Sequence, residues 1–167
     1  MTRNLLGICA VALTALTAAA CRGDGTGDAR VARANTAGDA APADTMVVYK
    51  SPTCGCCNNW VDHVKENGFA VVTHDISDAE LTETKRELGV PAGRISCHTA
   101  TVRGYTIEGH VPADLIHRLI SEGPVGVRGL AVPGMPIGSP GMEGVITQNY
   151  DVLAFDEAGN VEVYAQR

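Results

Sequence analysis

The chain has 167 residues, of which 45% are hydrophobic and 19% charged, proportions that fit one folded domain with added segments. Its formal net charge is -6 and the sequence has no run of Lys or Arg, which excludes the basic surface of a nucleic-acid-binding protein. With one Trp, two Phe and 19 Gly, the core must consist mainly of Val, Leu, Ile and Ala, which suits a small α/β domain.

The first residues have the pattern of an export signal. Arg3 is followed by an uncharged, mostly apolar stretch over residues 5–20, and Cys21 comes directly after three alanines. About 16 residues are too few for a transmembrane helix, which needs roughly 20. We therefore predict that residues 1–20 are a signal peptide and that the protein is periplasmic or otherwise extracytoplasmic.

The residues around Cys21 allow two interpretations. Ala-Ala-Ala-Cys suits ordinary signal peptidase and also resembles the lipobox of bacterial lipoproteins, although Ala18 stands where a branched residue is usual. We favour Cys21 as a lipidated residue that anchors the protein to a membrane. The alternative is a cleaved soluble form in which Cys21 is incidental. A lipid at Cys21 is the only membrane contact that we predict.

Residues 21–45 are predicted to be a disordered tether. Residues 22–45 are almost wholly Gly, Ala, Asp, Thr, Arg and Pro, so they have too few apolar side chains to offset the entropy of folding. A flexible chain of this length reaches about 25 to 30 Å, which would hold a domain clear of a membrane surface. The folded, metal-binding domain is predicted over residues 46–167.

The domain is predicted to begin with a strand and a helix on either side of a cysteine-rich segment. Residues 46–49 form a short buried strand. After Cys57, an apolar stripe at helical spacing predicts a helix, and Gly68 follows it at the position where a left-handed cap is favoured. Residues 69–73 form a second strand.

The next elements are a helix, two strands and another helix. Ser77 and Glu80 have the spacing of a capping box, so a helix is predicted up to Gly89. Residues 99–102 and 105–107 form two short strands. Pro112 stands where the first turn of a helix accepts proline. The apolar stripe of that last helix is Leu115, Ile116, Leu119 and Ile120.

The predicted order is therefore β-α-β-α-β-β-α, the order of thioredoxin and glutaredoxin folds, and the fold class is α/β and thioredoxin-like. In such folds a Cys-x-x-Cys between the first strand and the first helix carries the chemistry. Residues 125–144 are expected to form a Gly/Pro-rich loop. Residues 150–155 and 161–164 are expected to form a C-terminal β-hairpin that is added to the minimal fold.

Three cysteines lie within four residues ahead of the first helix. Cys54 and Cys57 alone would make a redox pair, because a helix N-terminus lowers the pKa of a nearby thiol. Cys56 lies between them and would scramble a two-cysteine disulfide cycle. Three neighbouring thiolates suit soft cations, since sulfur is the preferred donor for copper(I) and zinc.

A second group of donors stands at the start of the third strand. In thioredoxin-like folds this position faces the Cys-x-x-Cys and is usually a cis-proline, which is generally thought to shield the sulfurs from metal. Residues 96–99 here read Ser-Cys-His-Thr, without proline. We infer that a protected redox site has become an open ligand set for copper(I), with zinc less favoured. The predicted ligands are Cys54, Cys56, Cys57, Cys97 and His98.

Further donors are conditional. His110 precedes a helix and can point at the same edge. Met135 and Met142 lie in the Gly/Pro-rich loop, where they have few core partners, and thioethers suit copper(I) better than zinc. The remaining histidines are expected to be surface or packing residues: His63, His74 and His117.

Two alternatives stay open. The four cysteines of the domain could form two structural disulfides, as is common in exported proteins, although a bridge between Cys54 and Cys57 closes too short a loop to add much stability. The chain could also be an enzyme, a thiol-disulfide or copper oxidoreductase in which Cys54 attacks and Cys57 resolves.

Four segments together resemble a known family. They are Tyr49–Cys57, Ser96–Ala100, Glu108–Ala113 and Gly129–Pro136. They are similar to the CopG-type periplasmic copper-resistance proteins, a thioredoxin-like family unrelated to the repressor of the same name, and the likeness extends over about residues 46–164. The resemblance implies a periplasmic role in copper handling, thiolates that bridge more than one copper ion, and a part in moving electrons to or from copper. Other periplasmic copper-handling proteins are the partners that it implies.

Overall fold

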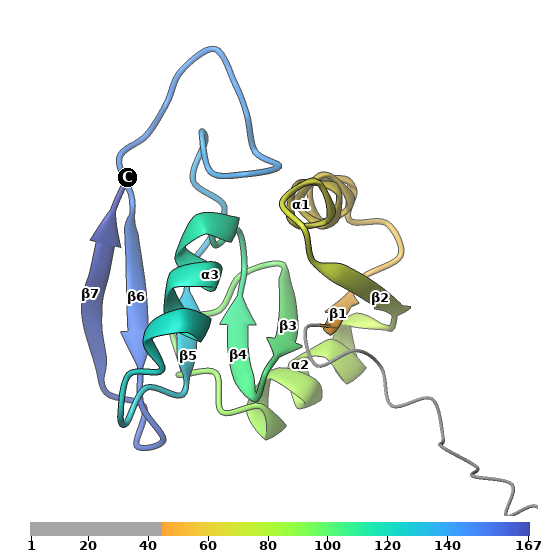
Figure 1. The fold of residues 1–167 in the computed structure, drawn as a ribbon. Helices are drawn as coiled ribbons and strands as arrows, with labels where there is room; N and C mark the ends of the chain where they lie inside the picture. Colours follow the sequence, from red (N-terminus) through yellow and green to blue (C-terminus); the bar gives the residue numbers. More distant parts are fainter. Residues whose placement is uncertain (1–44) are drawn as a thin grey trace, which may run out of the picture. The chain divides into compact units, whose positions relative to one another are not determined.

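The computed structural model describes residues 45–167 (Figure 1). The predicted signal peptide, Cys21 and all but the last residue of the predicted tether lie outside the described residues, so they stay predictions. Strand β1 begins at Thr45, one residue before the predicted start of the domain. Within the described part of the chain, no helix is long and apolar enough to cross a membrane.

One mixed sheet of seven strands runs through the domain in the order β2-β1-β3-β4-β5-β6-β7. β1 pairs parallel with β2, β4 pairs parallel with β5, and the other neighbours are antiparallel. The strands are β1 (Thr45–Lys50), β2 (Ala70–Asp75), β3 (His98–Val102), β4 (Tyr105–Glu108), β5 (Gly129–Ala131), β6 (Asp151–Phe155) and β7 (Val161–Gln166).

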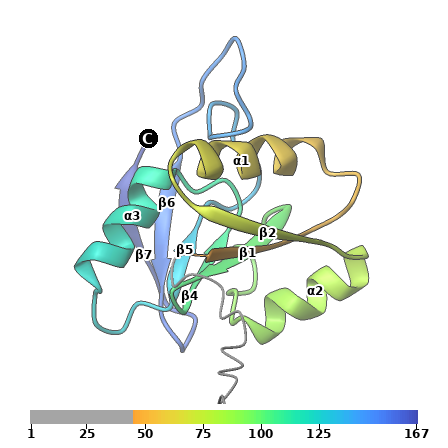
Figure 2. The same ribbon diagram turned by 45° about the vertical axis from the view of Figure 1, so that its right-hand side comes forward.

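In the described part of the chain, three helices accompany the sheet: α1 (Gly55–Glu66), α2 (Asp78–Glu87) and α3 (Ala113–Glu122). The apolar faces of α1 and α3 share one core with the sheet, in which Trp60, Ile116 and Met46 are completely buried. α2 lies apart from the other two helices and contacts β1 and β3 (Figures 1 and 2). Burial of these apolar side chains is the main source of stability of the domain.

The local signals in the sequence have the expected structural roles. The Ser77 hydroxyl accepts the N–H of Glu80, and the Glu80 carboxylate accepts the N–H of Ser77, so the capping box of α2 is complete. Gly123 ends α3 in the left-handed conformation that glycine favours. Pro112, expected inside the first turn of α3, lies one step earlier, at its N-cap.

The sheet extends further than the sequence predicts. Residues 129–131, expected to belong to a loop, form β5, which pairs parallel with β4 and antiparallel with β6. Gly129 permits this close approach, because a Cβ there would overlap the Thr106 carbonyl and the Phe155 ring. The C-terminal hairpin is therefore part of the main sheet. The α/β class is confirmed, with one sheet and three helices among the described residues, and the first seven elements follow in the order β-α-β-α-β-β-α.

Candidate metal centre

Three cysteines come together where β1 passes into α1. Cys54 is the N-cap residue of α1, and Cys56 and Cys57 lie in its first turn. The N–H of Cys54 donates to the carbonyl of Ser51 at 3.1 Å, which closes the turn between strand and helix. Cys57 is buried, whereas Cys54 and Cys56 are half-buried. We call Cys54, Cys56 and Cys57 the sulfur turn.

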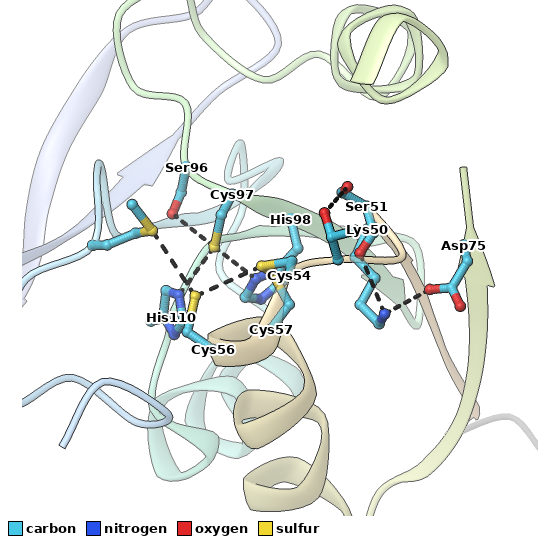
Figure 3. Close-up of a disulfide and its surroundings, with 12 residues drawn as sticks. Lys50, Ser51, Cys54, Cys56, Cys57, Asp75, Ser96, Cys97, His98 and His110 are labelled. Atoms are coloured by element: carbon cyan, nitrogen blue, oxygen red, sulfur yellow. Dashed lines mark hydrogen bonds and ion pairs between the residues drawn. A yellow bond between two sulfur atoms is a disulfide. The ribbon is translucent and has the colours of Figure 1, made fainter. Parts of the chain in front are cut away.

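Within the sulfur turn, Cys54 and Cys57 are joined by a disulfide, and Cys56 is free (Figure 3). This pairing differs from the prediction that all three cysteines are thiolate ligands. Since a disulfide has no thiolate, reduction by two electrons must precede metal binding by Cys54 and Cys57 as thiolates. The structure thus shows the oxidised form of this turn.

Cys97 lies just before β3, the strand next to β1, and its side chain reaches the sulfur turn from there. β1 and β3 are antiparallel neighbours with Lys50 opposite His98, so the end of β1 and the start of β3 lie side by side. The four Sγ atoms of Cys54, Cys56, Cys57 and Cys97 all lie within 4.8 Å of one another. Donors that are far apart in the sequence therefore share one site.

Two buried imidazoles lie on the other side of Cys97. The Cys97 Sγ is 3.4 Å from Nδ1 of His98 and 3.0 Å from Nε2 of His110 (Figure 3). These three residues form a second group whose donor atoms lie within 4.8 Å of one another. We call Cys97, His98 and His110 the imidazole side. His110, a conditional donor in the sequence analysis, is thus part of the cluster.

The protonation of His110 follows from its contacts. Its Nδ1 lies 2.8 Å from the carbonyl oxygen of Pro140, and a carbonyl can only accept, so Nδ1 carries the proton. Burial lowers the pKa of His110, which favours the neutral ring. The lone pair is then on Nε2, which points at the Cys97 sulfur. A carbonyl that orients an imidazole in this way is typical of metal sites.

His98 has no exposed surface and is held mainly by packing. Its ring lies against Trp60, with 4.3 Å between ring centroids, and the Trp60 Nε1 donates to the carbonyl of Val111 at 2.9 Å. Burial strongly lowers the pKa of His98, so its ring is neutral. Nε2 has no hydrogen-bond partner among the described residues, and Nδ1 is the nitrogen that faces Cys97.

Cys97 itself is protonated in the metal-free protein. Burial, and after it the neighbouring Cys56, raise the pKa of the Cys97 thiol to about 12. At neutral pH its S–H can therefore donate to the lone pair of His110 Nε2, at 3.0 Å. A metal ion that binds Cys97 as a thiolate must displace this proton.

Met135, one of the two predicted methionine donors, lies close to a sulfur of the cluster. The Sδ of Met135 lies 3.9 Å from Sγ of Cys56, and its side chain is 51% exposed. For Met142 the structure gives backbone hydrogen bonds, with Ser139 and Gly138. Its role as a donor stays a prediction.

The Gly/Pro-rich loop is packed onto the site through backbone contacts. Gly141 has φ +81°, and a Cβ there would lie 2.7 Å from the backbone nitrogen of Trp60 and 2.8 Å from the carbonyl oxygen of Cys56. The preceding residue, Pro140, supplies the carbonyl that orients His110. One loop therefore contacts both the first turn of α1 and the imidazole side.

The other three histidines make packing or capping contacts. Nε2 of His63 accepts the N–H of Ala113 at 3.2 Å, at the start of α3. His74 stacks on Tyr49 and His117 stacks on Phe69, with ring centroids 5.4 and 4.3 Å apart.

A buried ion pair beside the cluster was missed by the sequence analysis. Nζ of Lys85 lies 2.6 Å from Oε1 of Glu108, and both side chains are buried. The signals were a lysine four residues after Leu81, on the apolar face of α2, and a glutamate directly after the apolar residues of β4. A charge at such a position indicates a partner inside the protein.

A cleft of about 610 Å³ opens beside the cluster. Cys54 and Cys97 line it together with Leu81 of α2 and with Ile95, which is 56% exposed. One cysteine of the disulfide and one free cysteine therefore border the same opening.

Comparison with known proteins places the chain in a family. The profile of DUF411, a family described as protein of unknown function, matches residues 94–142. A search of curated proteins found no match. Two solved structures of copper resistance protein CopG, form 1 and form 2, are each 40% identical to this chain and cover 74% of it; the matches include 96% and 97% of those chains, with TM-scores of 0.68 and 0.67. At this identity and coverage, the chain belongs to the CopG-type copper resistance family.

Proposed function

We propose that this chain binds copper(I) outside the cytoplasm and takes part in copper handling or resistance. The observation that carries the proposal is the position of the Cys97 sulfur, which belongs both to the group of four sulfurs and to the group with two imidazoles. Thiolates and imidazoles in this combination suit a soft metal ion. The solved relatives at 40% identity are copper resistance proteins, which favours copper as that metal.

The reduced protein would offer thiolates from the sulfur turn and from Cys97, with Nδ1 of His98 and Nε2 of His110 as imidazole donors. Because Cys97 is shared by both groups, its sulfur can bridge two ions. The site has enough donor atoms to bind more than one copper ion. Met135 beside Cys56 adds a thioether, which favours copper(I) over zinc.

The copper test uses the full chain, reduced and kept without oxygen. Titration with copper(I) against a coloured copper(I) chelator should show uptake, accompanied by ultraviolet absorption from copper-thiolate bonds and by release of protons. Protein whose thiols have been alkylated is the control and should take up far less. If the protein takes up no copper(I) although all four thiols of the domain are free, the proposal is overturned.

A second candidate function, a thiol-disulfide or copper oxidoreductase, is favoured by the disulfide between Cys54 and Cys57. Its formation from two thiols releases two electrons and two protons. A disulfide of another molecule could accept both, whereas two copper(II) ions would take the electrons, becoming copper(I), and the protons would pass to solvent. The order of the first seven elements and the disulfide at the N-terminus of α1 support a thioredoxin-like fold, in which such chemistry is familiar.

Variants separate the two candidate functions. Turnover of a dithiol or disulfide substrate that is lost in Cys54→Ser but kept in Cys97→Ser and His98→Ala would favour the enzyme, because the last two residues are needed for metal alone. Copper(I) uptake without turnover would favour the binding protein. Mass spectrometry after alkylation also detects the form with two disulfides, in which no thiol of the domain is free.

We also propose that the protein is exported and anchored through a lipid on Cys21, where it would exchange copper with other periplasmic copper-handling proteins. The support is the N-terminal sequence and the length of the predicted tether. Cys21→Ala should move the protein from the membrane fraction to the soluble periplasmic fraction. An unchanged distribution between these fractions would argue against the anchor.

A further inference from the structure

The carboxylate of Glu108 binds three groups from different parts of the chain. Its side chain is completely buried. Oε1 accepts the backbone N–H of Ser96 at 2.6 Å and lies 2.6 Å from Nζ of Lys85, while Oε2 accepts the hydroxyl of Thr99. A charged acceptor with several donors inside a protein makes strong and specific hydrogen bonds.

Two of these partners stand on either side of the donor residues Cys97 and His98. Ser96 comes immediately before them and Thr99 immediately after. Lys85 reinforces the second contact, since its Nζ also donates to Oγ1 of Thr99 at 2.7 Å. One buried ion pair thus holds both ends of a segment of two residues that supplies a sulfur and a nitrogen.

The residue after Glu108 completes the arrangement. The N–H of Gly109 donates to the carbonyl of His98 at 3.0 Å. Gly109 has φ +71°, and a Cβ there would overlap the side chain of Ser96 and lie 2.7 Å from the carbonyl oxygen of Val132. The chain then continues directly to His110. The segment around Glu108 therefore sets the spacing between the two imidazoles as well.

Packing alone does not require a lysine and a glutamate at these positions. Apolar side chains of similar volume often stabilise a protein as well as a buried ion pair does, because the ion pair loses its hydration. The ion pair differs in that it directs hydrogen bonds to particular atoms. We therefore expect the ion pair to contribute mainly to the geometry of the segment that it holds.

We propose that Lys85 and Glu108 are positioning residues that hold Cys97 and His98 ready for the metal. They act through Ser96 and Thr99 and do not touch the ion themselves. The inference rests on the proposed copper function. Fixed residues around a metal site orient its ligands, and their loss typically lowers affinity about 10- to 100-fold.

The main test replaces both charges in the full chain, as Lys85→Met/Glu108→Met. Removal of one partner would leave an unpaired buried charge and could prevent folding, whereas replacement of both avoids that. The reduced variant should bind copper(I) about 10- to 100-fold more weakly, and X-ray absorption should show fewer copper-nitrogen contacts. Arg128→Met/Glu157→Met is the control for loss of two charges, because it removes another ion pair of 2.6 Å, more exposed than the first, that involves none of the donor residues.

A pair of substitutions at Thr99 gives a test that does not depend on the double variant. Thr99→Ser keeps the hydroxyl and loses a methyl group, whereas Thr99→Val keeps the shape and loses the hydroxyl. Positioning predicts that Thr99→Val loses about 10-fold in copper(I) affinity, within the range for residues around a metal site, and that Thr99→Ser stays near wild type. A purely structural role of Thr99 in the core would affect the serine variant more.

The outcomes distinguish this inference from the copper proposal. If the wild-type protein takes up no copper(I), the proposed function fails. If the wild type binds copper(I) and the folded variants match its affinity and its X-ray absorption spectrum, only the positioning role is overturned.

Discussion

The sulfur turn and the imidazole side meet at Cys97 but are built differently. In the sulfur turn, Cys54 and Cys56 are half-exposed, and Cys54 is in a disulfide that reduction would open. On the imidazole side, His98 and His110 have no exposed surface, and their neighbours hold each ring in place. The site thus combines a part whose donors depend on the redox state with a part whose geometry is set in advance.

This difference assigns separate tasks to the two parts. A preorganised set of donors loses little entropy when it binds an ion. Donors that can be removed by oxidation give a means of releasing the ion. Cys97 is on the imidazole side, and its sulfur also lies within 4.8 Å of those of the sulfur turn, so it should matter more to copper binding than any cysteine of that turn.

The largest expected effect separates Cys97 from Cys56. Cys97→Ser removes the shared sulfur from both groups and should lower copper(I) affinity more than about 100-fold, beyond the range typical of residues around a metal. Cys56→Ser removes a sulfur from one group only, and about 10-fold is expected. Competition with a copper(I) chelator measures both. Equal losses would remove the distinction between the two parts.

The next effect tests the loop that contacts both parts. In Gly141→Ala a new Cβ would press on the backbone of Trp60 and Cys56, so the free energy of unfolding should fall by about 2 kcal/mol more than in Gly159→Ala. Gly159 has nearly the same φ, +80°, but no atom of residues 45–167 lies within 4 Å of its Cβ position, so it controls for backbone strain. Urea unfolding measures the difference, and equal losses would show that the contact is unimportant.

A smaller effect concerns the exposed edge of the sulfur turn. Met135→Leu should lower copper(I) affinity about threefold, which corresponds to roughly 0.7 kcal/mol, and leave zinc affinity unchanged, because a thioether favours copper(I). Met142→Leu is the matched variant and should have no effect. A loss in Met142→Leu as large as that in Met135→Leu would bring Met142 into the site.

The smallest effect concerns His63, a histidine outside both parts. It accepts the N–H of Ala113, and burial lowers its pKa below the ordinary value of 6.5. The unfolded chain then binds a proton at His63 more readily than the folded protein does. The contribution of neutral His63 to the free energy of unfolding is therefore fully present above about pH 6.5 and is lost as the pH falls towards the lower folded pKa. The fall in the free energy of unfolding at low pH should be smaller in His63→Gln than in the wild type, by less than about 1 kcal/mol.

Urea unfolding at pH 7.5 and at pH 5.5, in wild type and in His63→Gln, isolates this contribution. His98 and His110 also have lowered pKa values, and they destabilise the protein in the same direction as the pH falls, but they do so in both proteins. An identical pH dependence in the two proteins would mean that His63 does not contribute.

Elements with strong local signals could be predicted from the sequence. The capping box at Ser77, the glycine after α3 and the valines and aromatic residues of β6 and β7 each act within a few residues, so they do not depend on the rest of the fold. β5 could not be predicted, because three residues are too short for a periodic pattern and are stabilised by β4 and β6 on either side. The roles of Lys85 and Glu108 could not be predicted, because each charge is buried only as the partner of the other, and the two residues are far apart in the sequence.

Local sequence alone specifies the types of donor in the site and the crowding of three sulfurs into one turn, since the covalent chain limits how far neighbouring residues can separate. Tertiary structure decides the rest. The pairing of β1 with β3 brings Cys97 to the turn, the carbonyl of Pro140 selects Nε2 of His110, and burial keeps both imidazoles neutral. Each of these depends on contacts between segments that are distant in the chain, which no local pattern encodes.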